Sequence, residues 1–106
     1  MPCLNLSTNV NLDGVDTVSI MSEVTSTVAK IMGKPESYVM VLLKGSVPIS
    51  YGGTVEPAAY GELASVGGLN PDANRKLSAG IAAILESKLS IAKSRFFLKF
   101  NDSKAS

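Results

Sequence analysis

PCLNLST, at residues 2–8, alternates the apolar side chains of Leu4 and Leu6 with smaller or more polar ones. A period of two residues is typical of a β-strand, so this segment predicts a first strand over Pro2–Thr8. A helix pattern and a second strand pattern follow it, and the second half of the chain has the same order. The sequence therefore predicts two copies of the strand, helix and strand that begin here.

The first helix is predicted between Asp13 and Gly33. Asp13 is a candidate N-cap, whereas Gly33 followed by Pro35 is a stop signal. The apolar residues between them recur at helical spacing: Ile20, Met21, Val24, Val28, Ile31 and Met32. Tyr38–Leu43 is then a continuous apolar run of strand length, which is typical of a strand covered on both faces. We expect this strand to lie centrally in the sheet.

The second half begins after Gly45–Pro57, a segment rich in glycine and proline that indicates turns. Ala58–Val66 is predicted as a strand that ends at a pair of glycines. Asn70-Pro71 supplies an N-cap and a proline at the first position of a second helix. The apolar stripe of this helix is Ala73, Leu77, Ile81, Ile84, Leu85 and Leu89. Arg95–Phe100 is expected to close the fold as a strand.

This order is a duplicated βαβ arrangement, with pseudo-repeats at about residues 2–44 and 58–101. The predicted fold class is α+β, with an α/β-like order, in a single domain over residues 1–106. Two helices on one face of a four-stranded sheet leave the other face uncovered. We therefore expect that face to pack against other subunits in a homo-oligomer.

The composition excludes several classes of chemistry. The chain has no histidine, no tryptophan and a single cysteine, Cys3. Ser-His-Asp and Cys-His nucleophilic sites, histidine-ligated zinc and CxxC redox pairs all need residues that are absent. An enzyme of this composition must use an amine, a carboxylate, a phenol or a hydroxyl, and we expect neither a metal nor a cofactor.

Charge and hydropathy exclude other partners. The 10 basic and 9 acidic residues are scattered and give a net charge of +1, so no binding of nucleic acid or of an anionic membrane is expected. No apolar run approaches the roughly 20 residues that span a bilayer, and the N-terminus lacks the pattern of a signal peptide. Lys104-Ala105-Ser106 is not the peroxisomal Ser-Lys-Leu signal. We expect a cytoplasmic protein.

Pro2 is a candidate catalytic residue because it directly follows Met1. Methionine aminopeptidases remove a methionine in this context and expose a secondary amine. An α-amino group has a pKa of about 7.7 to 8.0 in model peptides, and burial beside a cation lowers that pKa. A neutral amine can then act as a general base near pH 7. The alternative is an ordinary Met-Pro start without catalytic consequence.

Five segments together resemble the macrophage migration inhibitory factor and D-dopachrome tautomerase family, particularly its plant members. They are Met1–Leu4, Gly33–Tyr38, Tyr51–Thr54 with Glu56-Pro57, Ser65–Gly67 and Ser94–Phe97. The resemblance implies a homotrimer whose amino-terminal proline lies in a pocket at the subunit boundary. It also implies keto-enol tautomerisation of a small α-keto acid or a dopachrome-like ligand, with the proline as base and acid.

The resemblance places the family's catalytic proline on Pro2 and its substrate-orienting lysine on Lys34. Lys34 would then hold the carboxylate of the substrate, stabilise the developing enolate and lower the pKa of the proline amine by repulsion. The alternative role of Lys34 is structural, as a cation beside the C-terminus of the first helix. The family's Ser-Ile pair at the end of the third strand corresponds to Ser65 and Val66.

Two further pocket positions depart from the family pattern. Phe97 stands where the migration inhibitory factor has a tyrosine contributed by a neighbouring subunit, and Lys99 stands where it has asparagine. Phe97 keeps an apolar wall but lacks the hydroxyl group, and Lys99 adds a second cation. The resemblance therefore implies a weak or altered substrate range, especially for phenolic substrates.

Other departures limit what the resemblance implies. The family's Cys-x-x-Cys corresponds to Ala58–Gly61, which excludes a thiol oxidoreductase. Its receptor-binding arginine and aspartate correspond to Leu12 and Ser46, which weakens receptor binding through that surface. The family's Gly-Trp segment has no counterpart after Asn101–Ser106. The alternative is an interaction or signalling protein with a protein partner or receptor and vestigial tautomerase activity. A nuclease role on Glu23 ranks below both, because Glu23 is expected on the solvated face of its helix.

Overall fold

The computed structural model describes residues 1–102; residues 103–106, which include the C-terminal Lys-Ala-Ser, lie outside the described residues. The strand, helix and strand order occurs twice. Its elements are β1 (Cys3–Thr8), α1 (Thr17–Met32), β2 (Met40–Lys44), β3 (Ala59–Ser65), α2 (Pro71–Leu89) and β4 (Phe96–Asp102), with 3-10 turns at Glu36–Tyr38 and Lys93–Arg95.

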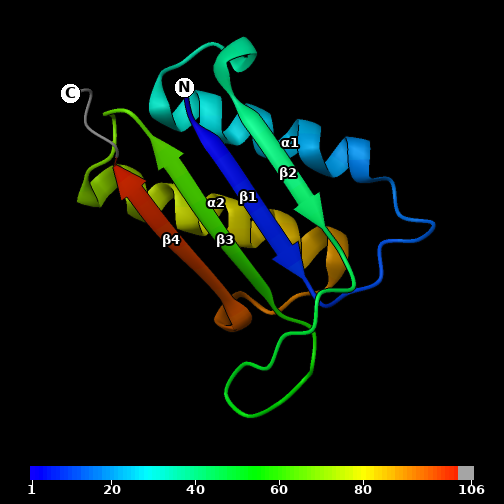
Figure 1. The fold of residues 1–106 in the computed structure, drawn as a ribbon. Coiled ribbons are helices and arrows are strands. Elements are labelled where there is room, and N and C mark those ends of the chain that lie inside the picture. The colour runs from blue at the N-terminus through cyan, green and yellow to red at the C-terminus, as the bar shows by residue number, and fades with distance from the viewer. Residues whose placement is uncertain (103–106) are drawn as a thin grey trace.

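The strands form one mixed sheet in the order β2-β1-β3-β4. Each half of the chain contributes a parallel pair, β1 with β2 and β3 with β4, and the two halves join antiparallel through β1 and β3. Both helices lie on the same face of the sheet (Figure 1). The predicted α+β class, with two helices on one face of a four-stranded sheet, is confirmed.

The core lies between the sheet and the helices. Leu4 and Leu6 of β1 and Leu63 of β3 are at most 1% exposed, and they pack against equally buried residues of the two helices, among them Val24 and Leu77. Burying a side chain of this size contributes about 1.5 to 3 kcal/mol. The alternation predicted for residues 2–8 is therefore real: the leucines face the helices.

The helix ends follow local capping chemistry, with one correction. The N-cap of α1 is Asp16, not Asp13, because the Asp16 carboxylate accepts the Ser19 N–H at 3.0 Å. Gly33 ends α1 at φ 65°, as predicted. In α2 the Asn70 side chain accepts the N–H of Ala73 at 2.8 Å and Pro71 is the first helical residue, which confirms both predictions.

The prediction that the strand near residues 38–43 lies centrally is wrong. β2 is an edge strand, and only Val41 and Leu43 are directed towards the helices. Met40 and Leu42 lie on the other face and are 54% and 37% exposed. The run is apolar on both faces, as a central strand would be, but among residues 1–102 nothing covers its second face.

The uncovered face of the sheet is called the open face below. Its residues are Cys3, Asn5, Ser7, Met40, Leu42, Lys44, Tyr60, Glu62, Ala64, Phe97, Lys99 and Asn101. Tyr60 and Phe97 are neighbours in the register, and their rings stack with centroids 6.1 Å apart. Exposed apolar side chains gathered on one face are typical of an interaction surface.

Candidate functional site

Four of the six predicted site residues lie at one end of the sheet, where β1 and β2 begin and β3 ends (Figure 1). The strand register brings Val39, just before β2, and Ser65 of β3 to either side of Pro2. Met40 donates its backbone N–H to the Pro2 carbonyl oxygen at 2.9 Å. We call the group of Pro2, Lys34, Ser65 and Val66 the proline end.

Pro2 and Met1 differ sharply in burial. Pro2 is among the fully buried side chains, below 2% exposed, whereas Met1 is 70% exposed. While Met1 is attached, the Pro2 nitrogen belongs to a peptide bond, where resonance removes its basicity. Removing the exposed Met1 would convert this nitrogen to an amine and leave the proline ring in its packed position.

Lys34 directly follows the glycine that ends α1, and its backbone N–H donates to the Ala29 carbonyl at 3.0 Å. The residue is exposed. Within residues 1–102, Arg75, Lys76 and Lys88 form ion pairs, whereas Lys34 forms none. The position suits both of its predicted roles, the substrate ligand and the cation at a helix C-terminus.

The residues at the end of β3 have different surroundings. Ser65 is 2% exposed, and its hydroxyl donates to the Gly67 carbonyl at 2.9 Å, so it shapes the turn that follows. Asp102 of β4 accepts the Gly67 N–H at 3.1 Å and holds the same turn from the other side. Val66 is 52% exposed. Val66 therefore offers an apolar surface next to the strand position beside Pro2.

Phe97 and Lys99 are not brought together with Pro2 in one chain. They pair with Tyr60 and Glu62 on the open face, so Phe97 lies towards the far end of β1 and Lys99 lies near its middle. At a rise of about 3.3 Å per residue, the level of Phe97 is roughly 17 Å from Pro2 along the strand direction. One chain thus assembles four of the predicted site residues and carries the other two elsewhere on its surface.

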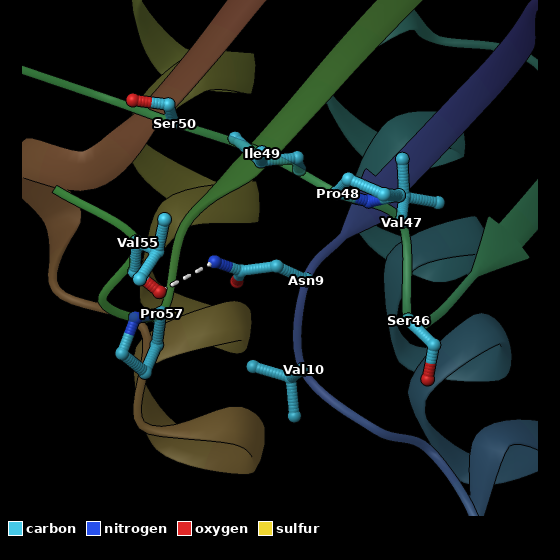
Figure 2. A pocket seen from close by; sticks show the side chains of 9 residues that line it. All are labelled: Asn9, Val10, Ser46, Val47, Pro48, Ile49, Ser50, Val55 and Pro57. Carbon is cyan, nitrogen blue, oxygen red and sulfur yellow. Dashed lines mark hydrogen bonds between the residues drawn. The ribbon is translucent and has the colours of Figure 1, made fainter. Parts of the chain in front are cut away.

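The opposite end of the sheet contains a cavity of about 660 Å³ that the sequence did not reveal (Figure 2). Its lining residues are Asn9, Val10, Ser46, Val47, Pro48, Ile49, Ser50, Val55 and Pro57, called the loop end below. The Asn9 side chain donates to the carbonyls of Val55 and Glu56 at 3.1 and 2.9 Å and accepts the Ala58 N–H at 2.9 Å. The turn-rich composition of Gly45–Pro57 was the only sequence signal for this region.

The loop end offers no acid or base, because none of its lining residues is ionisable. Within residues 1–102 there is also no group of three or more acidic, histidine or cysteine side chains placed to hold a metal ion. Among the helices of the same residues, none is sufficiently long and apolar to cross a membrane.

Comparison with known proteins identifies the family. The model of the family described as "Macrophage migration inhibitory factor (MIF)" matches residues 1–106. A macrophage migration inhibitory factor homolog of Trichinella spiralis is 38% identical over 100 residues, which cover 94% of this chain and 87% of the relative. The homolog of Trichuris trichiura is 37% identical over 106 residues, with 100% and 92% covered.

Solved structures have the same fold. The macrophage migration inhibitory factor homologue of Prochlorococcus marinus superimposes with a TM-score of 0.90 at 32% identity, covering 97% of this chain and 90% of that one. The structure of the Trichinella spiralis protein gives a TM-score of 0.87 at 35% identity, with 96% and 89% covered. The chain therefore belongs to the macrophage migration inhibitory factor family.

Proposed function

We propose that this chain is a keto-enol tautomerase of the phenylpyruvate or dopachrome type, with Pro2 as base and acid once Met1 has been removed. The observation that carries the proposal is the contrast between the buried Pro2 and the exposed Met1. Loss of Met1 would leave a secondary amine fixed at the start of β1. Membership of the family supports a tautomerase or cytokine-like function in general.

The mechanism requires only proton transfer and charge stabilisation. The neutral Pro2 amine takes a proton from the carbon alpha to the carbonyl, the C–H electron pair becomes the C=C bond, and the carbonyl pair moves to oxygen. The protonated amine then returns the proton to that oxygen, which gives the enol. Lys34 holds the substrate carboxylate and stabilises the developing negative charge. No cofactor is needed.

The rest of the pocket is proposed to come from two subunits of a homotrimer. Ser65 and Val66 would line it from the subunit that carries Pro2, whereas Phe97 and Lys99 would come from the open face of a neighbour. The exposed apolar side chains of that face support the assembly, because a neighbouring subunit would bury them. The plant-type character and the altered substrate range stay predictions; the relatives compared above are not plant proteins.

A second candidate is an interaction or signalling protein with vestigial catalysis. The observation that favours it is the cavity at the loop end, which lies at the opposite end of the sheet from Pro2. The exposed apolar side chains of the open face would then serve a protein partner or receptor instead of completing an active site.

The test is steady-state tautomerisation of phenylpyruvate and of a dopachrome ester, from about pH 5 to about pH 9, around the α-amino pKa. The protein must be shown by intact mass to lack Met1. Because the base acts only when deprotonated, kcat/KM should rise with pH through the pKa of the amine and then level off. Pro2→Gly should lower kcat by about 10²- to 10⁴-fold.

Pro71→Gly is the matched control, since Pro71 is an exposed proline at the start of α2, and it should keep the wild-type kcat. If folded protein that lacks Met1 has no turnover, the interaction or signalling function replaces the tautomerase function. Equal activity in Pro2→Gly and wild type would remove Pro2 from the mechanism.

A further inference from the structure

One side chain ties the start of β4 to the loop that precedes β3. Arg95 is the last residue of the turn Lys93–Arg95. Its hydrogen bonds run from Nε to Pro57 O at 2.9 Å, from Nη1 to Tyr51 O at 3.1 Å, and from Nη2 to Glu56 O at 3.0 Å and Thr54 O at 3.4 Å. The guanidinium also lies over the Tyr51 ring, 5.3 Å from its centroid. A single cation therefore holds four carbonyls of one loop.

These contacts are specific to arginine. A guanidinium is a flat fork of five N–H donors, and Arg95 uses all three of its nitrogens on carbonyls of one loop. A lysine ammonium keeps the charge but has three donors at a single point, so it cannot reach the same set of acceptors. The planar group is also the better partner for the aromatic face of Tyr51.

The contacts fall where the pairing of β3 and β4 begins. The first pair of that ladder is Ala59 with Phe96, and the next is Tyr60 with Phe97. A slip of one residue would turn Phe97 towards the helices, and the apolar pattern of β4 opposes it. A slip of two residues would keep Phe97 on the open face but separate its ring from that of Tyr60. The bonds from Arg95 to the loop oppose this second slip.

We infer that Arg95 is a positioning residue for the aromatic wall of the active site. It holds β4 at the register in which Phe97 stacks on Tyr60, and so fixes the ring that the open face offers to Pro2 of a neighbouring copy. The inference rests on the proposed function, because Phe97 walls the site only in that assembly. The substrate group that this wall receives is the apolar side chain of the α-keto acid.

The inference is tested by the KM and kcat of Arg95→Ala, Phe97→Ala and the double variant on phenylpyruvate. Arg95→Ala should raise KM roughly tenfold, the size of a typical coupling between residues that act together, and leave kcat and the pH profile unchanged. In the Phe97→Ala background the same change should raise KM no further. Arg95→Lys should fall between Arg95→Ala and wild type.

Arg75→Ala is the matched control, because Arg75 is exposed and bonds only to Asp72 one turn away in α2. Equal KM values for Arg95→Ala and Arg75→Ala would overturn the inference, as would independent effects of Arg95→Ala and Phe97→Ala in the double variant. If Arg95→Ala does not fold, the same cycle with Arg95→Lys decides.

Wild-type protein without Pro2-dependent turnover would overturn the proposed function itself. In that case, hydrogen exchange still tests the role of Arg95 in the loop. Faster deuterium uptake across residues 51–57 in Arg95→Lys would identify Arg95 as the residue that fixes the loop, and unchanged uptake would overturn that role.

Discussion

At the proline end of the sheet, Pro2 is buried while Lys34 and Val66 are exposed around it. At the loop end, a cavity of about 660 Å³ is lined by residues of which none is ionisable. The proposed catalytic residues and this cavity thus lie at opposite ends of the sheet. In the proposed homotrimer, the open face of a neighbouring copy would complete the pocket around Pro2 with Phe97 and Lys99.

Subunit mixing would test this division most severely. At a phenylpyruvate concentration well below KM, Pro2→Gly should have little activity alone, and Phe97→Ala should have a reduced activity because its KM is raised. After mixing, dissociation and reassembly, random assembly should give roughly a quarter of the sites an intact Pro2 and a Phe97 from different chains. The regained turnover measures that fraction. Mixtures that stay as inactive as their components would show that one chain makes the whole site.

Lys34→Ala tests the proposed substrate ligand at the proline end. If Lys34 binds the substrate carboxylate, its loss should raise KM by about 10- to 100-fold, as expected for a hydrogen bond to a charged group. Lys30→Ala, which removes an exposed cation in the last turn of α1, is the control. If Lys34 serves only the helix dipole, both variants should lose about 0.3 to 1 kcal/mol of stability and keep the wild-type KM.

Asn9→Ala tests whether the loop end is structural. The change removes three hydrogen bonds and leaves the Ala58 N–H and two loop carbonyls without that partner. The free energy of unfolding should fall by about 1 to 3 kcal/mol, as measured by chemical denaturation, and kcat should not change. Asn11→Ala, whose side chain accepts a single bond from Asp13, should cost less. A lower kcat at unchanged stability would place the loop end in the chemistry.

Local signals in the sequence predicted most of the fold. The alternation in residues 2–8, the stop at Gly33 and the Asn70-Pro71 start of α2 all depend on neighbours in sequence, and all are confirmed. The prediction of Asp13 as N-cap failed because Asp16 is an equally suitable acceptor, and only the path of the loop decides which carboxylate reaches a helical N–H. The place of β2 failed because an apolar run does not reveal whether its second face is covered within the chain or outside it.

The candidate site was predictable only in part. Family motifs indicated Pro2, Lys34, Ser65 and Val66, and the fold places them at one end of the sheet. The resemblance implied that the Phe97 position serves a neighbouring subunit, but the distances of Phe97 and Lys99 from Pro2 depend on the strand register, which no linear pattern gives. Arg95 was invisible as a positioning residue for the same reason, because its partners lie 38 to 44 residues away in sequence.

The two edges of the sheet have a consequence for quality control in the cell. β2 and β4 run in opposite directions, and within residues 1–102 neither has a partner on its outer side. Each unpaired edge is a template for another strand. A head-to-tail joint between such edges gives a ring where its rotation closes, and otherwise continues as a fibre. In the proposed homotrimer, closure of the ring would occupy these edges and so keep this chain from polymerising.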